Sequence, residues 1–147
     1  MARNRLKSKG RAEGGGFIAL PHALHDSPAF ASLSGIEHKV LLGLMRQYRG
    51  NNNGNLSASH TQAKEWGVGS KTSLANALDR LQQIGLIIRT REGVFLNPGG
   101  RCALYALAWL PIDDCPGKAL EVLPTTTPPL KLSMLKSRMP GPVSVPG

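Results

Sequence analysis

The chain has 147 residues, of which 41% are hydrophobic, and its 18 Lys and Arg against 9 Asp and Glu give a net charge of +9. A charge this basic on so small a protein favours a nucleic-acid partner. No stretch is apolar for long enough to cross a bilayer, and the first 16 residues lack the apolar run of a signal peptide. The two cysteines need not form a disulfide in a reducing compartment, so we expect a cytoplasmic protein with no membrane partner.

Residues 1–16 form a basic segment that ends in three consecutive glycines. Because glycine-rich chain is flexible, we predict a disordered arm that adds phosphate contacts and reads no bases. The alternative interpretation is a solvated tail whose charge has no partner. The arm residues that we assign to DNA contact are Arg3, Arg5, Lys7, Lys9 and Arg11.

Residues 17–110 are enough for one modest folded domain, and its first clear element is a helix. Ser34 and Glu37 have the spacing of a capping box, in which each side chain bonds to the other residue's backbone, so the helix should begin there and end at Gly50. The asparagines that follow predict a turn leading into a short strand at 55–57. The predicted apolar face of the helix consists of Ile36, Val40, Leu41, Leu44, Met45 and Tyr48.

Two further helices, separated by a glycine-containing turn, follow the short strand. Ser59 and Gln62 form a second capping box, and Gly67-Val68-Gly69 predicts a sharp exit from this helix. Ser70 can cap the next helix, which Gly85 closes, and its apolar side chains recur every three or four residues. That stripe is Leu74, Ala77, Leu78, Leu81 and Ile84, and the opposite face carries Thr72, Asn76, Asp79 and Gln83.

A pair of strands joined by a flexible loop completes the domain. Residues 86–91 are rich in β-branched side chains, and residues 102–109 alternate so that one face carries Tyr105, Leu107 and Trp109. This element order predicts an α+β winged helix-turn-helix, with a three-helix core and a small antiparallel sheet as the wing. The arginines at the stems and end of the loop are Arg89, Arg91 and Arg101.

The residues also resemble a known family. The run from Ser70 to Leu81, followed by Ile84-Gly85-Leu86-Ile87, resembles the recognition helix and first wing strand of bacterial and phage winged helix-turn-helix proteins, including the MarR-like regulators. Residues 17–22, 27–30 and 49–54 are similar to the start of small helix-turn-helix proteins of bacteria and their mobile elements. The resemblance covers residues 17–110 and implies DNA binding. In two respects the chain departs from it: the turn is about one residue longer than the shortest helix-turn-helix units, and the long dimerisation helices of MarR-like proteins are not legible.

These features predict sequence-specific binding of double-stranded DNA by a transcriptional regulator. Thr72, Ser73 and Asn76 would contact base edges, Lys71 and Arg80 would reach phosphates, and the wing arginines would contact adjacent backbone or minor groove. The full recognition-helix set is Ser70, Lys71, Thr72, Ser73, Asn76 and Arg80. The alternatives are a replication or mobile-element maintenance protein with the same module, and a winged-helix protein-interaction module that does not bind DNA. The sequence is compatible with a homodimer.

Residues 111–147 are rich in proline and threonine, which predicts a mostly disordered tail from Asp113 onward. Two weaker patterns lie within it. Residues 118–123 are compatible with one turn of helix, and residues 130–138 interleave apolar and basic side chains as in a segment that folds against a protein partner. We favour disorder, because so few residues do not sustain an isolated helix.

Catalytic and metal sites find little support. Gly67 to Ser73 superficially resembles a phosphate-binding loop, but Ser70 stands where glycine must precede the lysine. His22 and His25 could share a helical face, yet no other His or Cys has the spacing that completes a zinc site. Cys102 lies in a predicted core strand, where apolar surroundings would raise the thiol pKa and keep it inert. We therefore expect no enzyme activity, no metal and no cofactor.

Overall fold

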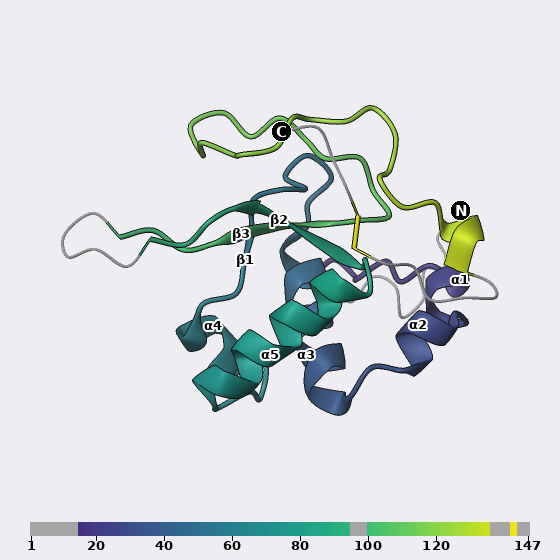
Figure 1. Cartoon of the computed structure of the whole chain (residues 1–147), viewed down its shortest axis with the longest axis horizontal. Helices are drawn as coiled ribbons and strands as arrows, with labels where there is room; N and C mark the ends of the chain where they lie inside the picture. The colour runs from purple at the N-terminus through teal and green to yellow at the C-terminus, as the bar shows by residue number, and fades with distance from the viewer. Residues whose placement is uncertain (1–14, 95–99, 136–141, 144–147) are drawn as a thin grey trace.

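The computed structural model describes residues 15–94, 100–135 and 142–143, and within them the chain is a mixed α+β unit with five α-helices and a three-stranded antiparallel sheet (Figure 1). The predicted α+β class is confirmed. The arm residues Arg3 to Arg11 and the loop tip at 95–99 lie outside the described residues. The elements in order are α1 (His22–His25), α2 (Pro28–Ala31), α3 (Gly35–Gln47), β1 (Leu56–Ser57), α4 (His60–Glu65), α5 (Lys71–Gln83), β2 (Ile87–Arg91), β3 (Leu104–Leu107) and a 3-10 turn, η2 (Leu132–Leu135).

The helix starts follow the predicted capping chemistry. Both capping boxes are formed, Ser34 with Glu37 at the start of α3 and Ser59 with Gln62 at the start of α4. Ser70 Oγ accepts a hydrogen bond from the backbone N–H of Ser73 and so caps α5. Each of these caps satisfies a backbone donor that the first helical turn leaves unpaired, which fixes where the helix begins.

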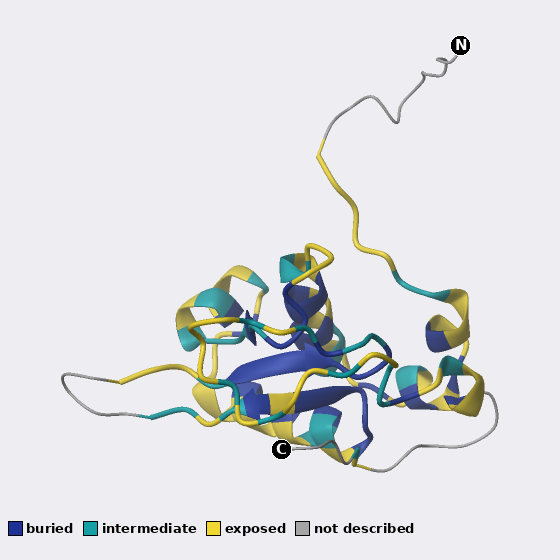
Figure 2. Cartoon of the chain, turned by 90° about the horizontal axis from the view of Figure 1, so that it is seen from above, coloured by how far each residue is buried: buried dark blue, intermediate teal, exposed yellow. Residues whose placement is uncertain are grey.

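The predicted apolar stripe of α5 is confirmed, since all five of its side chains are buried. It packs against α3 and the sheet, whose strand order is β1-β3-β2. In Figure 1, α3, α4 and α5 lie below the sheet and the chain after β3 runs above it. Figure 2 shows the strands as the buried centre of the molecule. The apolar face predicted for α3 is wrong at Ile36, which lies in the first turn of the helix and is 39% exposed.

The predicted disorder of the tail is wrong for residues 113–135. Leu130 and Leu135 are buried in the hydrophobic core, and the backbone N–H of Leu130 donates to the carbonyl of Ala108 at 2.9 Å. Residues 118–123 contain no helix and instead lie along β2, where the N–H of Glu121 donates to the carbonyl of Thr90. The prolines prevent regular structure, but apolar side chains at irregular spacing still fix the segment in place. The rest of the predicted tail, residues 136–141 and 144–147, lies outside the described part.

The predicted place of Cys102 is also wrong. Strand β3 begins at Leu104, so Cys102 precedes it and is exposed to solvent. Burial in a core strand therefore does not protect this thiol. Cys115 is half-buried, and burial, followed by the nearby carboxylates of Asp113 and Asp114, raises the pKa of its thiol.

Candidate nucleic-acid interface

The outward face of α5 is polar and exposed. Four side chains at helical spacing lie exposed along it, and Lys71 is exposed at its first turn. Ser73, which we assigned to base contact, is half-buried and points partly toward the body of the protein. The four exposed side chains are Thr72, Asn76, Asp79 and Gln83.

The turn before α5 fixes where that face begins. The glycine at position 67 has φ +88°, and Val68 is almost fully buried, so Val68 anchors the turn in the core. His60 Nε2 lies 2.9 Å from the carbonyl oxygen of Gly69, and Lys39 Nζ donates to the carbonyl of Gly67 at 3.4 Å. These contacts tie α3, α4 and α5 together at the end of α5 that carries Lys71.

Trp66, at the end of α4, packs directly against α3. Its indole lies on Gly43, where a Cβ would come within 2.3 Å of two ring carbons. Any side chain at residue 43 would therefore push the ring away. Gly43 is thus part of the scaffold that orients the two helices around the turn.

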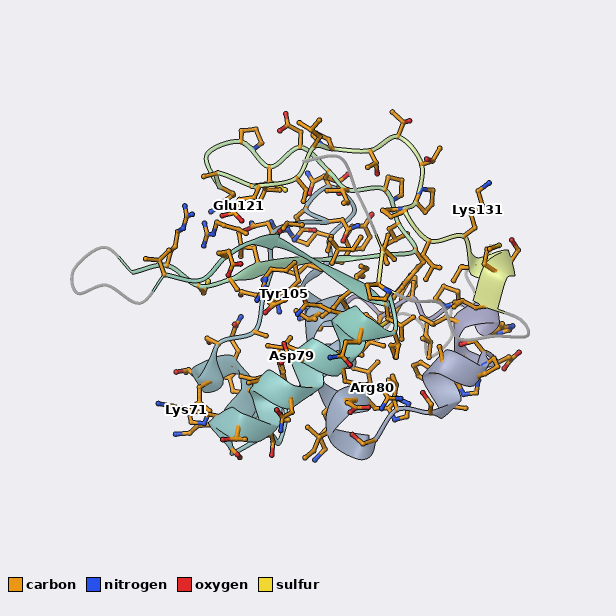
Figure 3. All side chains as sticks on the ribbon, in the orientation of Figure 1. Lys71, Asp79, Arg80, Tyr105, Glu121 and Lys131 are labelled. Atoms are coloured by element: carbon orange, nitrogen blue, oxygen red, sulfur yellow. The ribbon has the colours of Figure 1, made fainter. Side chains whose placement is uncertain are left out.

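Arg80 follows Asn76 by four residues, so the two lie one turn apart on neighbouring parts of the same face of α5. Arg80 is half-buried, and its guanidinium donates to Ser32 Oγ at 3.2 Å, at the end of α2. Figure 3 shows Lys71 at one end of α5 and Arg80 on the side facing α2. Arg80 therefore lies beside the exposed row, but its guanidinium is directed toward Ser32. Lys71 is exposed at the first turn of the helix.

The three loop arginines all have intramolecular partners. Arg89 lies 3.5 Å from the carboxylate of Glu92, and Arg101 lies 3.5 Å from the carboxylate of Glu121. Arg91 donates to the carbonyl of Cys102 at 2.6 Å and to that of Lys118 at 3.0 Å, so it holds the β2–β3 hairpin to the tail. The two ion pairs are exposed and the backbone contacts of Arg91 are structural.

Tyr105 joins the α5 surface to the hairpin. It is buried in β3 directly opposite Arg89 in β2, and Figure 3 shows it just above Asp79. Burial raises the pKa of the Tyr105 phenol, the Arg89 guanidinium opposes that rise and the Asp79 carboxylate adds to it. Both charges act on the same hydroxyl because the middle of α5 and the base of the hairpin lie side by side.

Two residues at this surface were not singled out from the sequence. Glu121 pairs with Arg101 and accepts a hydrogen bond from the N–H of Glu92, although it comes from the irregular tail. Lys39 reaches the turn from an exposed position on α3. No periodic or motif signal identifies either one, because each reaches the surface through tertiary contacts between segments distant in the chain.

The described residues show neither a metal site nor a membrane-spanning helix. No three His, Cys, Asp or Glu side chains gather there in a way that could hold a metal ion. No helix of the described part is both long and apolar enough to cross a membrane.

Comparisons of this chain with protein-family models, with curated proteins and with solved structures found no match.

Proposed function

We propose that this protein binds double-stranded DNA sequence-specifically, as a winged helix-turn-helix protein that places α5 in the major groove. The observation that carries the proposal is the exposed face of α5, where Thr72, Asn76 and Gln83 stand in one row beyond the basic first turn. Side chains of these types are the ones that pair with base edges.

The chemistry of each side chain assigns its role. The Asn76 amide can form two hydrogen bonds with an adenine edge, and the Asp79 carboxylate can accept one from the amino group of cytosine. Asp79 also repels phosphate, which disfavours docking in a register that brings it near the backbone. Lys71 lies at the positive end of the α5 dipole, so both its own charge and the helix favour a phosphate there.

The β2–β3 hairpin would act as the wing. Exposed ion pairs contribute about 0–1 kcal/mol, so DNA phosphates can replace the carboxylates that face Arg89 and Arg101. Arg91 has a different role, because its guanidinium already holds two backbone carbonyls. In this proposal Arg89 and Arg101 contact DNA and Arg91 keeps the hairpin in place.

The role of transcriptional regulator rests on the sequence resemblance described above. A protein that occupies a major groove excludes other proteins from the same site. The proposal implies a cytoplasmic protein.

Selection of bound sites from random duplex DNA tests this function. The full-length protein should enrich one motif, and Asn76→Ala should weaken binding to that motif by about 1–3 kcal/mol and relax the preference at one base pair. Asn51→Ala, an exposed asparagine in the loop after α3, is the matched control and should leave the motif unchanged. Recovery of no motif by the wild-type protein would contradict sequence-specific binding.

A further inference from the structure

A second surface with nucleic-acid chemistry lies where the N-terminal chain passes the end of α3. A pocket of about 470 Å³ is lined there by Gly16, Phe17, Ile18, Arg46, Tyr48 and Arg49. None of these residues belongs to α5, β2 or β3. This volume is in the range of small-molecule sites, so the pocket can receive one nucleotide unit.

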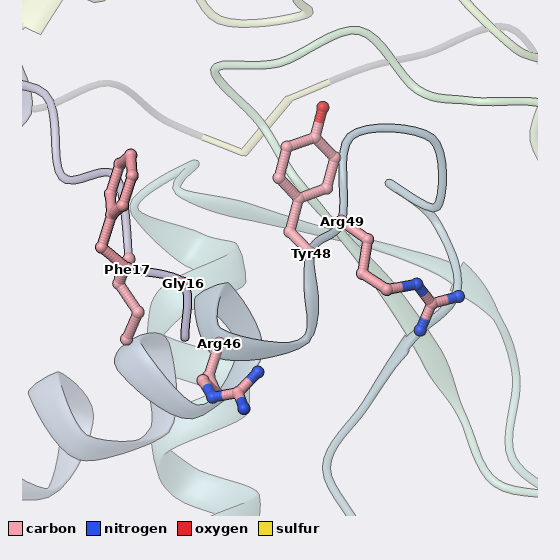
Figure 4. Close-up of a pocket in the computed structure, with 6 residues that line it drawn as sticks. Gly16, Phe17, Arg46, Tyr48 and Arg49 are labelled. Atoms are coloured by element: carbon pink, nitrogen blue, oxygen red, sulfur yellow. The ribbon is translucent and has the colours of Figure 1, made fainter. Parts of the chain in front are cut away.

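The pocket combines aromatic rings with positive charge. Figure 4 shows the rings of Phe17 and Tyr48 standing apart, with the guanidinium groups of Arg46 and Arg49 below them. Within the described residues, neither guanidinium has a hydrogen-bond or ion-pair partner, and no acidic side chain lines the pocket. Two arginines that share a pocket with no carboxylate favour an anionic ligand.

Phe17 offers an exposed aromatic face at this pocket. Its side chain is 92% exposed, the highest among the large hydrophobic residues of the described part. A solvent-exposed aromatic ring can stack on the flat face of a nucleic-acid base. The two neighbouring guanidinium groups can bind the phosphate of the same nucleotide. Burial, followed by the charge of Asp113, raises the pKa of Tyr48, whose phenol can donate a hydrogen bond to a ligand in the pocket.

We propose that this pocket binds a nucleotide unit of single-stranded nucleic acid, with the base stacked on Phe17 and the phosphate held by Arg46 and Arg49. The site is independent of the duplex-binding surface on α5.

Fluorescence anisotropy of a labelled oligothymidine with the full-length protein tests the proposal. Phe17→Ala should lower the affinity by about 5- to 150-fold, the range expected for the loss of one stacked base. Arg46→Gln with Arg49→Gln should reduce the log–log salt slope by about 1.4, which corresponds to two single-strand phosphates. Each variant changes exposed side chains, so its thermal unfolding should match the wild type and separate a lost site from a lost fold.

Matched controls come from the tail, where Leu123→Ala removes another exposed apolar side chain and Lys118→Gln with Lys131→Gln removes two exposed charges. These controls should bind the strand as the wild type does. An abasic oligomer of the same length should bind at least fivefold more weakly than oligothymidine. Equal binding of the abasic strand, or no effect of the pocket variants, would overturn the proposal.

The two proposals can fail separately. Asn76→Ala should leave strand binding unchanged, since it alters only the α5 face. Strand binding that persists without duplex binding would remove the function proposed for α5 and keep the pocket. Duplex binding with no strand binding would remove the pocket proposal and keep the function proposed for α5.

Discussion

The side chain of Asn53 makes both hydrogen bonds with Leu107 that a neighbouring β-strand would make. Its Nδ2 donates to the Leu107 carbonyl at 3.0 Å, and the Leu107 N–H donates to its Oδ1 at 2.7 Å. The same Nδ2 also reaches the carbonyls of Leu110 and Pro111. Asn53 is fully buried, and its amide connects the loop after α3 to the end of β3 through these hydrogen bonds.

Asn53→Ala should therefore destabilise the fold strongly. The substitution leaves the buried N–H of Leu107 unsatisfied, at about 1–3 kcal/mol, and removes the hydrogen bonds of the amide to backbone carbonyls, so we expect a total loss of at least about 2 kcal/mol. Urea unfolding followed by circular dichroism measures the loss. The nearby exposed Asn51→Ala should change stability by less than about 0.5 kcal/mol, and equal effects of the two variants would show that the buried amide has no special role.

Gly43→Ala tests the contact that orients α4. The new Cβ would come within 2.3 Å of the Trp66 ring, so the ring must move, at a cost of about 1–3 kcal/mol that exceeds the gain of up to about 1 kcal/mol in helix propensity. Thermal unfolding should show a net loss, and tryptophan fluorescence should report greater exposure of the indole to solvent. Gly35→Ala, at the start of the same helix with open space around it, is the control and should be neutral or stabilising. A Gly43→Ala protein as stable as that control would contradict the packing described.

The tail segment contributes to the core, and a neighbouring pair of residues tests this. Leu135 is fully buried whereas Met134 is 47% exposed, although both lie in η2. Leu135→Ala should destabilise the protein by about 2–5 kcal/mol in urea unfolding, since it removes buried methyl groups and leaves a cavity. Met134→Ala should cost less than about 0.5 kcal/mol. Similar small effects for both would mean that this segment does not pack as described.

The negative charge of Glu121 should weaken DNA binding, because it offsets the positive charge of Arg101 in the hairpin. Its carboxylate faces Arg101, so Glu121→Gln should raise duplex affinity about two- to fivefold at low salt, because it removes a repulsion with phosphate of up to about 1 kcal/mol. Titrations of labelled duplex measure this change. Asp26→Asn removes the same charge beside α1, which Figure 1 places at the opposite end of the molecule from the hairpin, and should have little effect. An equal gain in both variants would reduce the effect to net charge alone.

Local signals in the sequence predicted α3, α4 and α5, because caps and periodic stripes depend on residues close together in the chain. Ser59 with Gln62 and the row from Leu74 to Leu81 are examples. The short helices α1 and α2 were not predicted. The burial of Leu135 and the role of Asn53 could not be predicted in this way. Leu135 lies in proline-rich chain without a period, and an asparagine in an asparagine run indicates a turn. Of the candidate site, the exposed row on α5 followed from its period, whereas the partners of Arg80, Arg91 and Arg101 arise from segments that only the fold brings together.

The salt dependence of duplex binding tests the central proposal most directly. If α5, the hairpin and the basic N-terminal residues together neutralise about five phosphates, the logarithm of the association constant should fall with the logarithm of salt concentration at a slope of about −4 to −5. Lys71→Gln should reduce that slope by about one unit. No binding of duplex DNA at low salt, or a slope near zero, would contradict the account and favour a winged-helix module that binds another protein.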